Sequence, residues 1–406
     1  PVLTYTSPVG SLVGNDTLTG ALARVSGEQV ASYPIRIGTL NNSNYLITFV
    51  DSALSITPAQ QSQLTVTTAT ITYQTPVALQ ATGGTEGDLG FSVVSSGSAG
   101  CSILNGTLSA SGNAGSTCTV KATRAATTNF SQIDSSTATI TVTRRAITVT
   151  GTAEEKTYGD ADPGFRFSVT AGSLHGSDSL AGTLTRAAGE NVGTYTINQG
   201  TLDNSNYTIT YVSSQLTVIP RPITITATNK TKIFGQPDPA LTYTVTVGNI
   251  VNSDVISGEI TRAAGETLGN YNITRGTLVN NNYNITFVSG IFQITGAPQA
   301  GFTLTASSYS VVYQQTIAVQ TSGGNGQGTV SYSAQNGTGS CSIAGTTVTG
   351  TTAGTCTVTA TKAAEGGYLE AISNPITVTV DKADQTITFA PIVDHNYSPT
   401  PMAITP

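Results

Sequence analysis

Apolar and polar side chains alternate along most of this chain, most regularly between residues 144 and 219. The segments Ala146–Thr150, Tyr195–Ile197, Tyr207–Tyr211 and Leu216–Val218 carry apolar or aromatic side chains at every second position, with mostly Thr between them. A period of two is typical of β-strands, which direct successive side chains to opposite faces. The pattern therefore predicts short strands with one apolar face packed inward and one hydroxyl-bearing face in water.

Turn-forming residues separate these segments and leave little room for helices. Clusters such as Ala188–Asn191 and Asp203–Asn206 contain the Gly, Asn and Asp residues that favour turns. One short helical turn is expected, with Ser177 or Asp178 as its cap. Many short strands separated by turns are typical of an all-β fold of the sandwich class.

One series of residues recurs three times along the chain. Each copy contains an Arg followed four positions later by Glu, then a Tyr, and finally an Asn-Tyr pair. The recurring residues are Arg24, Glu28, Tyr33 and Tyr45, then Arg186, Glu190, Tyr195 and Tyr207, then Arg262, Glu266, Tyr271 and Tyr283. The first two copies are 162 residues apart and the last two are 76 apart. A fixed repeat predicts a modular array in which each copy is one structural unit.

A second, longer repeat contains the cysteines and lies between the copies of the first. Cys101 and Cys118 recur as Cys341 and Cys356. The two repeat lengths together predict small all-β modules, sandwiches or β-grasp-like sheets, joined end to end with almost no linkers. The expected modules are a partial short one at 1–57, a long one at 58–143, short ones at 144–219 and 220–295, a long one at 296–381, and at 382–406 the start of a further long module or an exchanged strand.

Both ends of the chain are expected to be incomplete. Pro1 aligns with Pro163, so the first module lacks about nineteen residues that its copies carry, including their first strand. The tail around Tyr397 resembles the opening of a long module around Tyr73. The sequence shows no signal peptide and no apolar run of membrane-spanning length. We expect the chain to be part of a longer polypeptide.

The four cysteines indicate two disulfides. Four cysteines allow three pairings, but each copy of the long repeat must fold alike, which selects Cys101 with Cys118 and Cys341 with Cys356. Two thiols without a nearby His or further Cys make a poor zinc site, so disulfides are favoured over a metal. Disulfides persist in oxidising compartments, which predicts an extracellular location.

Charge and histidine content argue against several function classes. Charged residues make up 9% of the chain, against about 25% in typical domains, and the formal net charge is −6. Phosphate binding needs clustered cations, so nucleic acid is not an expected partner. His175 is expected in an exposed loop, and His395 lies in the tail. No histidine has a positioned partner and no nucleophile motif is found, so we predict no catalytic residues.

Two acidic positions recur with the short repeat. They are Asp16, Asp178 and Asp254 at the first position, and Glu28, Glu190 and Glu266 at the second. The simpler interpretation is turn formation and capping, with each Glu pairing with the Arg four residues before it. The alternative is calcium bound near a module joint, since Ca²⁺ prefers oxygen ligands. The candidate ligands are Glu154, Glu155, Asp160 and Asp162, and no other cofactor is expected.

Several motifs carry a resemblance to known families. The second short module contains Tyr158-Gly-Asp160, Gly182-Thr-Leu-Thr-Arg186 and Asn206-Tyr207. On these residues it resembles the MBG repeat of the Tyr-Gly-x type, found in large bacterial surface and secreted proteins. The next copy departs from this motif, with Phe234-Gly-Gln236 in its place. The long module, with Gly354-Thr-Cys356-Thr-Val358, is similar to bacterial Ig-like repeats. These resemblances imply a cell-surface or secreted repeat protein, often an adhesin, without catalytic residues.

Three functions follow as hypotheses. The first is the structural stalk of a bacterial cell-surface or secreted adhesin, in which each module contacts its neighbours. The second is a subunit of an extracellular filament, sheath or surface layer, with other copies of the chain as partners and strand exchange as the contact. The third is an array that binds host or matrix glycans or proteins. In it Tyr45, Tyr207 and Tyr283 would stack on sugars, although alternation favours core packing for them.

Overall fold

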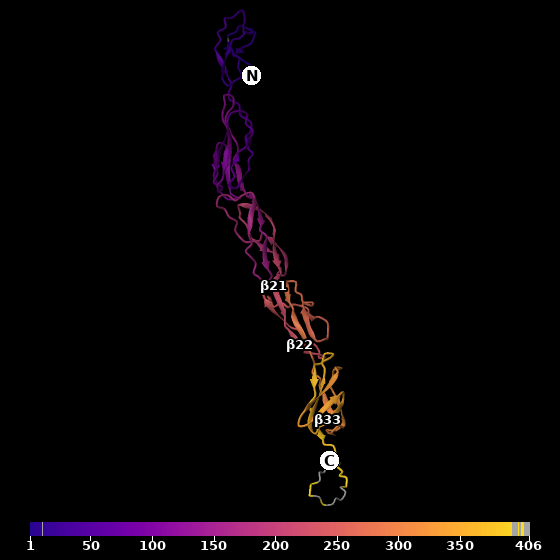
Figure 1. Cartoon of the computed structure of the whole chain (residues 1–406). Coiled ribbons are helices and arrows are strands. Elements are labelled where there is room, and N and C mark those ends of the chain that lie inside the picture. The colour runs from indigo at the N-terminus through magenta and orange to yellow at the C-terminus, as the bar shows by residue number, and fades with distance from the viewer. Residues whose placement is uncertain (10, 392–396, 398, 402–406) are drawn as a thin grey trace. The chain divides into compact units, whose positions relative to one another are not determined.

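The computed structural model in Figure 1 describes residues 1–9, 11–391, 397 and 399–401. Throughout these ranges the chain forms strands and turns and no helix, which confirms the all-β class. Accordingly, the described residues contain no helix that could cross a membrane. The chain divides into two compact units, Pro1–Ile219 and Pro220–Pro406.

The first unit begins with one small sheet, in the order β1-β2-β3. Residues 1–9 and 45–50 contribute no strand to it. The three strands are β1 (Ala23–Arg24), β2 (Ser32–Arg36) and β3 (Ser52–Ser55).

The next segment of this unit, which contains the first cysteine pair, forms three sheets. Their orders are β4-β7, β6-β10-β9 and β12-β11-β13-β5, with β8 also paired to β11. The strands are β4 (Thr65–Val66), β5 (Thr70–Thr72), β6 (Val77–Ala78), β7 (Ala81–Thr82), β8 (Leu89–Ser95), β9 (Ser102–Leu104), β10 (Thr107–Ser109), β11 (Thr117–Arg124), β12 (Ile133–Asp134) and β13 (Ala138–Thr143).

The first unit ends in a sandwich of two sheets, ordered β16-β14-β19 and β15-β20-β18-β17. In the first sheet, β14 runs parallel to β19 and antiparallel to β16. The strands are β14 (Arg145–Gly151), β15 (Glu154–Thr157), β16 (Phe167–Ala171), β17 (Thr185–Arg186), β18 (Gly193–Asn198), β19 (Tyr207–Val212) and β20 (Ser214–Ile219).

The second unit opens with the same sandwich, now ordered β23-β21-β26 and β22-β27-β25-β24. Figure 1 labels β21 and β22 of these two sheets. The strands are β21 (Arg221–Ala227), β22 (Lys230–Ile233), β23 (Tyr243–Val247), β24 (Thr261–Arg262), β25 (Gly269–Thr274), β26 (Tyr283–Val288) and β27 (Gly290–Thr295).

The second cysteine-containing segment follows, with sheets ordered β28-β30-β33-β32 and β29-β36-β34-β31, and with β35 also paired to β34. Residues 382–391 form no strand. The tail strand expected around Tyr397 falls largely outside the described residues, as does His395. The strands are β28 (Thr303–Ala306), β29 (Ser310–Val312), β30 (Thr316–Ser322), β31 (Val330–Asn336), β32 (Ser340–Ala344), β33 (Thr347–Thr352), β34 (Gly354–Lys362), β35 (Ala371–Ile372) and β36 (Ile376–Asp381).

The alternating pattern places the core as expected. In β14, Ile147 and Val149 are 3% and 0% exposed, while Thr148 and Thr150, which alternate with them, are half-buried. They share one core with Ile197 and Leu216 of the facing sheet. Burying one such aliphatic side chain contributes about 1.5–3 kcal/mol, so these positions hold the two sheets together.

One sequence expectation is corrected by the structure. The helical turn expected at Ser177 or Asp178 is a simple turn, in which the Asp178 amide donates to the His175 carbonyl oxygen at 3.0 Å. Asp178 has a different role, because its carboxylate accepts a hydrogen bond from Tyr207.

Candidate functional site

Four charged side chains meet on the sheet β22-β27-β25-β24. Lys232 lies on β22 at one edge and Arg262 on β24 at the other. The Lys232 Nζ lies 2.6 Å from Asp238 Oδ1 and 2.5 Å from Glu266 Oε2. Arg262 donates to both carboxylates in turn, with 2.6 Å between its Nε and Asp238 Oδ2. Positive and negative groups thus alternate around a closed ring, which we call the charged ring.

Aromatic side chains support the two cations of this ring. Phe292, which is 0% exposed, has Lys232 Nζ 6.0 Å and Arg262 Cζ 4.8 Å from its ring centroid. The Tyr271 ring lies 5.4 Å from Arg262 Cζ. The Lys232 and Arg262 side chains are 5% and 11% exposed, whereas Asp238 is 40% exposed. The cations have therefore lost most of their water and depend on the carboxylates and rings for compensation.

The charged ring recurs in the sandwich of the first unit. There Lys156 Nζ lies 2.6 Å from Asp162 and 2.7 Å from Glu190, and Arg186 binds the same two carboxylates. In residues 1–55, Arg24 pairs with Glu28. The pairing of each Glu with the Arg before it is thus confirmed. Sequence reasoning missed the lysine, although its recurrence as Lys156 and Lys232 was a usable signal.

A glycine fixes the path of the chain between the Arg and the Glu. Gly265 has a φ of +142°, and a Cβ there would lie 2.3 Å from the Tyr271 ring. The Gly265 carbonyl oxygen accepts a hydrogen bond from Arg262 Nη1 at 2.7 Å. Gly189 repeats this arrangement against Tyr195. The close approach of the tyrosine ring explains why each copy has glycine immediately before the Glu.

The charged ring holds its carboxylates in the ionised form. Hydrogen bonds from Arg262, and secondarily from Lys232, lower the pKa of Asp238 from 3.8 to about 2. The hydrogen bond from Arg186 likewise lowers the pKa of Asp162, and that from Lys232 lowers the pKa of Glu266. Groups locked in opposite charge states are suited to structural pairing rather than to proton transfer near neutral pH.

Acid is expected to loosen the repeat that contains Asp238. The folded carboxyl stays ionised down to about pH 2, whereas the unfolded one protonates near 3.8. Protons therefore bind the unfolded state preferentially, and stability falls as the pH drops through this window. The full shift corresponds to about 2.4 kcal/mol, which solvent screening of this 40% exposed side chain reduces to about 1 kcal/mol.

Hydrogen exchange read by mass spectrometry, corrected for intrinsic rates, measures this effect at pH 5 and pH 2.5. Amides of residues 223–293 should lose protection on acidification in the parent chain, and less so in Asp238→Asn. Residues 147–217, where Asp162 is unchanged, supply the internal control. Equal loss in both chains would contradict the assignment.

A tyrosine and an aspartate clamp a loop in each short repeat. Tyr207 donates to Asp178 Oδ2 at 2.6 Å and accepts from the His175 amide at 2.8 Å. Tyr283 makes the same bonds, 2.9 Å to Asp254 and 2.9 Å from the Val251 amide. In the first copy Tyr45 donates to Asp16 at 2.9 Å and accepts from the Val13 amide at 2.6 Å. This tyrosine clamp accounts for the recurrence of the Asp.

Removing the Tyr283 hydroxyl should weaken the clamp. Tyr283 is 6% exposed, and Tyr283→Phe would remove the hydrogen bond that its hydroxyl donates to the Asp254 carboxylate and the one that it accepts from the Val251 amide. A cost of about 1–2 kcal/mol is expected. Hydrogen exchange of residues 248–256 should accelerate relative to residues 172–180, which Tyr207 holds unchanged in the same chain. Unchanged exchange at both sites would rule out the clamp as a stabilising contact.

The sugar-stacking interpretation is wrong for two of its three tyrosines. Tyr207 and Tyr283 are 1% and 6% exposed, so neither offers a ring face to a glycan. Tyr45 is half-buried and its hydroxyl is bound to Asp16. His175 is exposed, as expected, and its ring meets the edge of Tyr73 at 6.5 Å between centroids.

Three segments of the chain match the family model of the MBG domain (YGX type), at residues 1–55, 147–217 and 223–293. The tyrosine clamp occurs in each of them and the complete charged ring in the last two. These segments are MBG repeats. The resemblance inferred from the Tyr-Gly-Asp and Gly-Thr-Leu motifs is thereby confirmed.

Comparison with other proteins adds little beyond the MBG repeats. No curated protein sequence matches the chain. Among solved structures, Drosophila N-cadherin EC1-4 aligns over 89% of this chain and 85% of its own, at 11% identity and a TM-score of 0.19. The N-terminal four Ig domains of Dscam1 isoform 6.9 align over 80% of this chain and 100% of their own, at 11% identity and a TM-score of 0.17. Domains 4-9 of the surface layer protein SbsC align over 87% of this chain and 69% of their own, at 10% identity and a TM-score of 0.17. Such low TM-scores say nothing about function.

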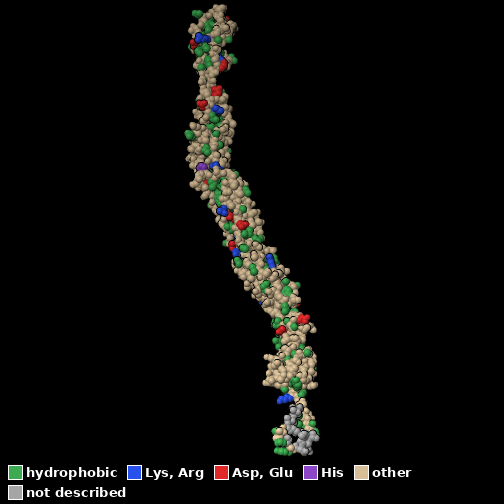
Figure 2. Space-filling model, in the orientation of Figure 1, with side chains coloured by type: hydrophobic (Ala, Val, Ile, Leu, Met, Phe, Trp, Pro, Cys, Tyr) green, Lys and Arg blue, Asp and Glu red, His purple; other side chains and the backbone are tan. Residues whose placement is uncertain are grey.

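The calcium candidates of the second MBG repeat do not come together. Glu154 accepts two hydrogen bonds from Arg166, at 2.9 and 3.2 Å, whereas Asp162 belongs to the charged ring. Glu155 and Asp160 are exposed. Within the described ranges, no three His, Cys, Asp or Glu side chains gather as a metal site requires. Charged side chains are also sparse on the face shown in Figure 2.

Each segment between or after the MBG repeats contains one disulfide. Cys101 is bonded to Cys118, with 6.1 Å between their Cα atoms, and Cys341 to Cys356, with 6.0 Å. All four cysteines are buried. The second bond fastens one sheet to the other, since Cys341 lies on β32 and Cys356 on β34. In the first bond, Cys101 directly precedes β9 and Cys118 lies on β11.

Side chains also connect neighbouring segments within each unit. In the first unit, Asn129 accepts from the Val30 amide at 3.0 Å, and Asn206 from the Ala114 amide at 2.9 Å. The Tyr73 and Tyr207 rings meet at 5.8 Å, so the buried cluster continues from the disulfide-containing segment into the MBG repeat. Each sheet nevertheless draws its strands from one segment.

The second unit has an aromatic contact at the corresponding place. The Phe234 and Tyr368 rings meet at 5.6 Å between centroids. Phe234 occupies the Tyr position of the Tyr-Gly-x motif, and a Cβ on Gly367 would lie 2.5 Å from its ring. The departure of this copy from the motif thus coincides with a packing contact between the MBG repeat and the next segment.

Proposed function

We propose that the chain is a structural repeat region, the stalk of a bacterial cell-surface or secreted protein of the adhesin type, and that it performs no catalysis. The observation that carries this proposal is the tandem arrangement of MBG repeats and disulfide-containing modules. Such an array holds a functional end of the protein away from the cell surface. The stability of a repeat array is roughly the sum of the stabilities of its modules and of the interfaces between neighbours.

The side-chain contacts between segments support a stalk of limited flexibility. Successive modules are linked in the first unit by the hydrogen bonds that Asn129 and Asn206 accept, and in the second by the ring contact of Phe234 with Tyr368. Each such contact must be broken for its joint to bend freely. Modules linked this way resist hinging more than modules on a bare linker do.

The chemistry of the modules supports a place outside the cytoplasm. Disulfides form and persist in oxidising compartments. The cations of the two charged rings are committed to carboxylates of the same repeat, so they offer no free site for an anionic substrate. These features favour a secreted structural role over an enzyme.

Electron microscopy of the purified chain, in dilute solution, tests the stalk. We expect separate particles of uniform length with restricted bending. The variant Phe234→Ala should bend more at the joint between residues 295 and 296, while Val255→Ala, at a loop side chain that is 73% exposed, serves as the control. Freely hinged modules in the parent chain would refute the proposal.

A further inference from the structure

Each complete MBG repeat pairs its first two strands in parallel with its last two. In the second repeat, residues 145–150 of β14 lie beside 207–212 of β19, and residues 154–157 of β15 lie beside 216–219 of β20. In both stretches the paired residues are 62 positions apart. β14 continues into β15 after two residues and β19 into β20 after one, so the two stretches pass together from one sheet into the other. We call this continuous pairing the parallel seam.

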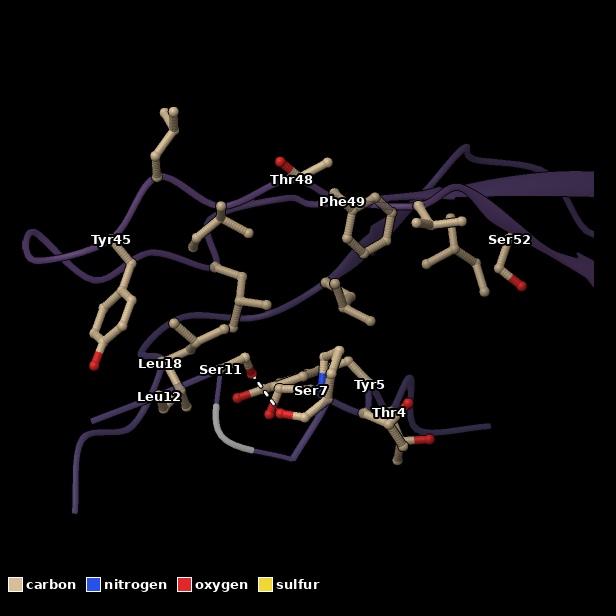
Figure 3. Close-up of a pocket in the computed structure, with 18 residues that line it drawn as sticks. Thr4, Tyr5, Ser7, Ser11, Leu12, Leu18, Tyr45, Thr48, Phe49 and Ser52 are labelled. Carbon is tan, nitrogen blue, oxygen red and sulfur yellow. Dashed lines mark hydrogen bonds between the residues drawn. The ribbon is translucent and has the colours of Figure 1, made fainter. Parts of the chain in front are cut away.

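The third repeat has the same seam. Residues 221–226 pair in parallel with 283–288, and 230–233 with 292–295, again 62 positions apart. In the first repeat, residues 45–50 correspond to β19 but form no strand, and they line one side of the cavity in Figure 3. The parallel seam is therefore a feature of the two complete repeats.

Tension along the chain loads the parallel seam in shear. The chain enters the second repeat at the start of β14 and leaves it at the end of β20. Because the paired strands are parallel, these two points lie at opposite ends of the seam. A pull between them draws one stretch past the other along its length. The hydrogen bonds of the seam then carry the load together, instead of breaking one after another as they do when a strand pair is peeled from one end.

Side chains hold the two stretches against sliding. Ile147 and Val149 of β14 share one core with Leu216 of β20, and all three are at most 3% exposed. Lys156 on β15 also bonds at 2.7 Å to Glu190, which precedes β18, while β20 lies between these two strands in the sheet. Sliding of the two stretches therefore breaks core contacts and an ion pair of the charged ring as well as backbone hydrogen bonds.

The disulfide-containing modules have much less parallel pairing. β5 pairs in parallel with β13 over three residues, and β29 with β36 over three. One isolated parallel bridge adds to each, Ala59 with Phe130 and Ala297 with Tyr368. Their disulfides instead tie residues that are 17 and 15 positions apart, which keeps the loop between the cysteines from extending. Under the same pull, these modules should give way before the complete MBG repeats.

We propose that the two complete MBG repeats are the tension-bearing elements of this chain. Their parallel seams, loaded in shear, keep the repeats folded under a pull that unfolds the disulfide-containing modules. The disulfides limit the length that those modules release. The inference deepens the proposed stalk and rests on it for its biological role. Force measurements decide the seam and electron microscopy decides the stalk, so either can fail alone.

Single-molecule force measurements on residues 1–406, pulled by the two ends of the chain, test the order of unfolding. About twenty Gly and Ser residues inserted after Gly164, an exposed loop residue with open space around it, mark the second repeat, because they lengthen its unfolding event by about 70 Å. We expect the marked event to be one of the two that require the highest force. A marked event below the force of the disulfide-containing modules would overturn the proposal.

The direction of the pull tests the seam within one repeat. Ala146→Cys and Ser205→Cys replace exposed residues at the same end of the seam, and the four native cysteines are disulfide-bonded, so the added thiols can carry the handles. Pulled between them, the seam opens from one end, and the repeat should unfold at roughly half the force or less. The same double variant pulled by its chain ends supplies the reference force, so the effect of the substitutions themselves cancels. Equal force in both directions would overturn the proposal.

Discussion

Replacing Arg262 with alanine should destabilise the third MBG repeat by about 3 kcal/mol. Removing one partner of a buried ion pair typically costs about 3–5 kcal/mol. The lower end of this range is expected because the partners Asp238 and Glu266 retain access to water. The change leaves one lysine to compensate two carboxylates. It also removes the stacking on Phe292 and the bond to the Gly265 carbonyl oxygen. Two ion pairs, two ring contacts and two hydrogen bonds to the backbone are lost with this one side chain.

The measurement uses the duplicated ring as its own control. Hydrogen exchange should accelerate about a hundredfold for core amides of residues 223–293, as expected for about 3 kcal/mol, while residues 147–217 of the same molecule stay protected by Arg186. Arg262→Lys keeps the charge but loses the planar fork, and should fall between the two. A loss below about 0.5 kcal/mol would place the ring among surface ion pairs of little effect.

Removing the second disulfide should have an effect of similar size in a different segment. Cys341 and Cys356 are 15 residues apart, and closing a loop of this length contributes about 3 kcal/mol in the chain-entropy model. The variant with Cys341→Ala and Cys356→Ala also leaves a small vacancy in a core where both residues are buried. The segment carrying β28 to β36 should therefore unfold at lower denaturant concentration than before.

The first disulfide provides the matched reference. Cys101 and Cys118 remain bonded in the variant, so exchange in β8 to β11 should not change, while amides of β34 and β36 lose protection. Because separate modules unfold separately, local exchange is a better measure than one global transition. Equal exchange in β34 with and without the bond would contradict a stabilising role.

Much of the fold could be predicted because its signals are local and repeated. The period of two in Ala146–Thr150 predicted β14, and its faces were assigned correctly, with Ile147 and Val149 inside. The pairing of Glu266 with Arg262 could also be predicted, because the two residues are four positions apart and this spacing recurs in each copy of the repeat. Turn geometry was less accessible, as the helical turn expected at Ser177 shows.

The candidate site was less predictable because it joins residues that are distant in sequence. Lys156 and Glu190 are 34 positions apart, and Tyr207 and Asp178 are 29 apart. Asp162 was a plausible calcium ligand by its chemistry, yet it lies between Lys156 and Arg186. Composition gave no means of distinguishing a carboxylate that binds a metal from one that binds two cations.

The sequence by itself determined that this protein is an array of small β-modules, because alternation specifies strands and repetition specifies copies, both of which are properties of the chain read in order. The tertiary structure alone decided which strand is central in each sheet of the two complete MBG repeats. It also decided which groups the hydroxyls of the buried Tyr207 and Tyr283 contact in the tyrosine clamp. The reason is physical: strand order and burial depend on contacts across many residues, which the alternating pattern of any single strand does not specify.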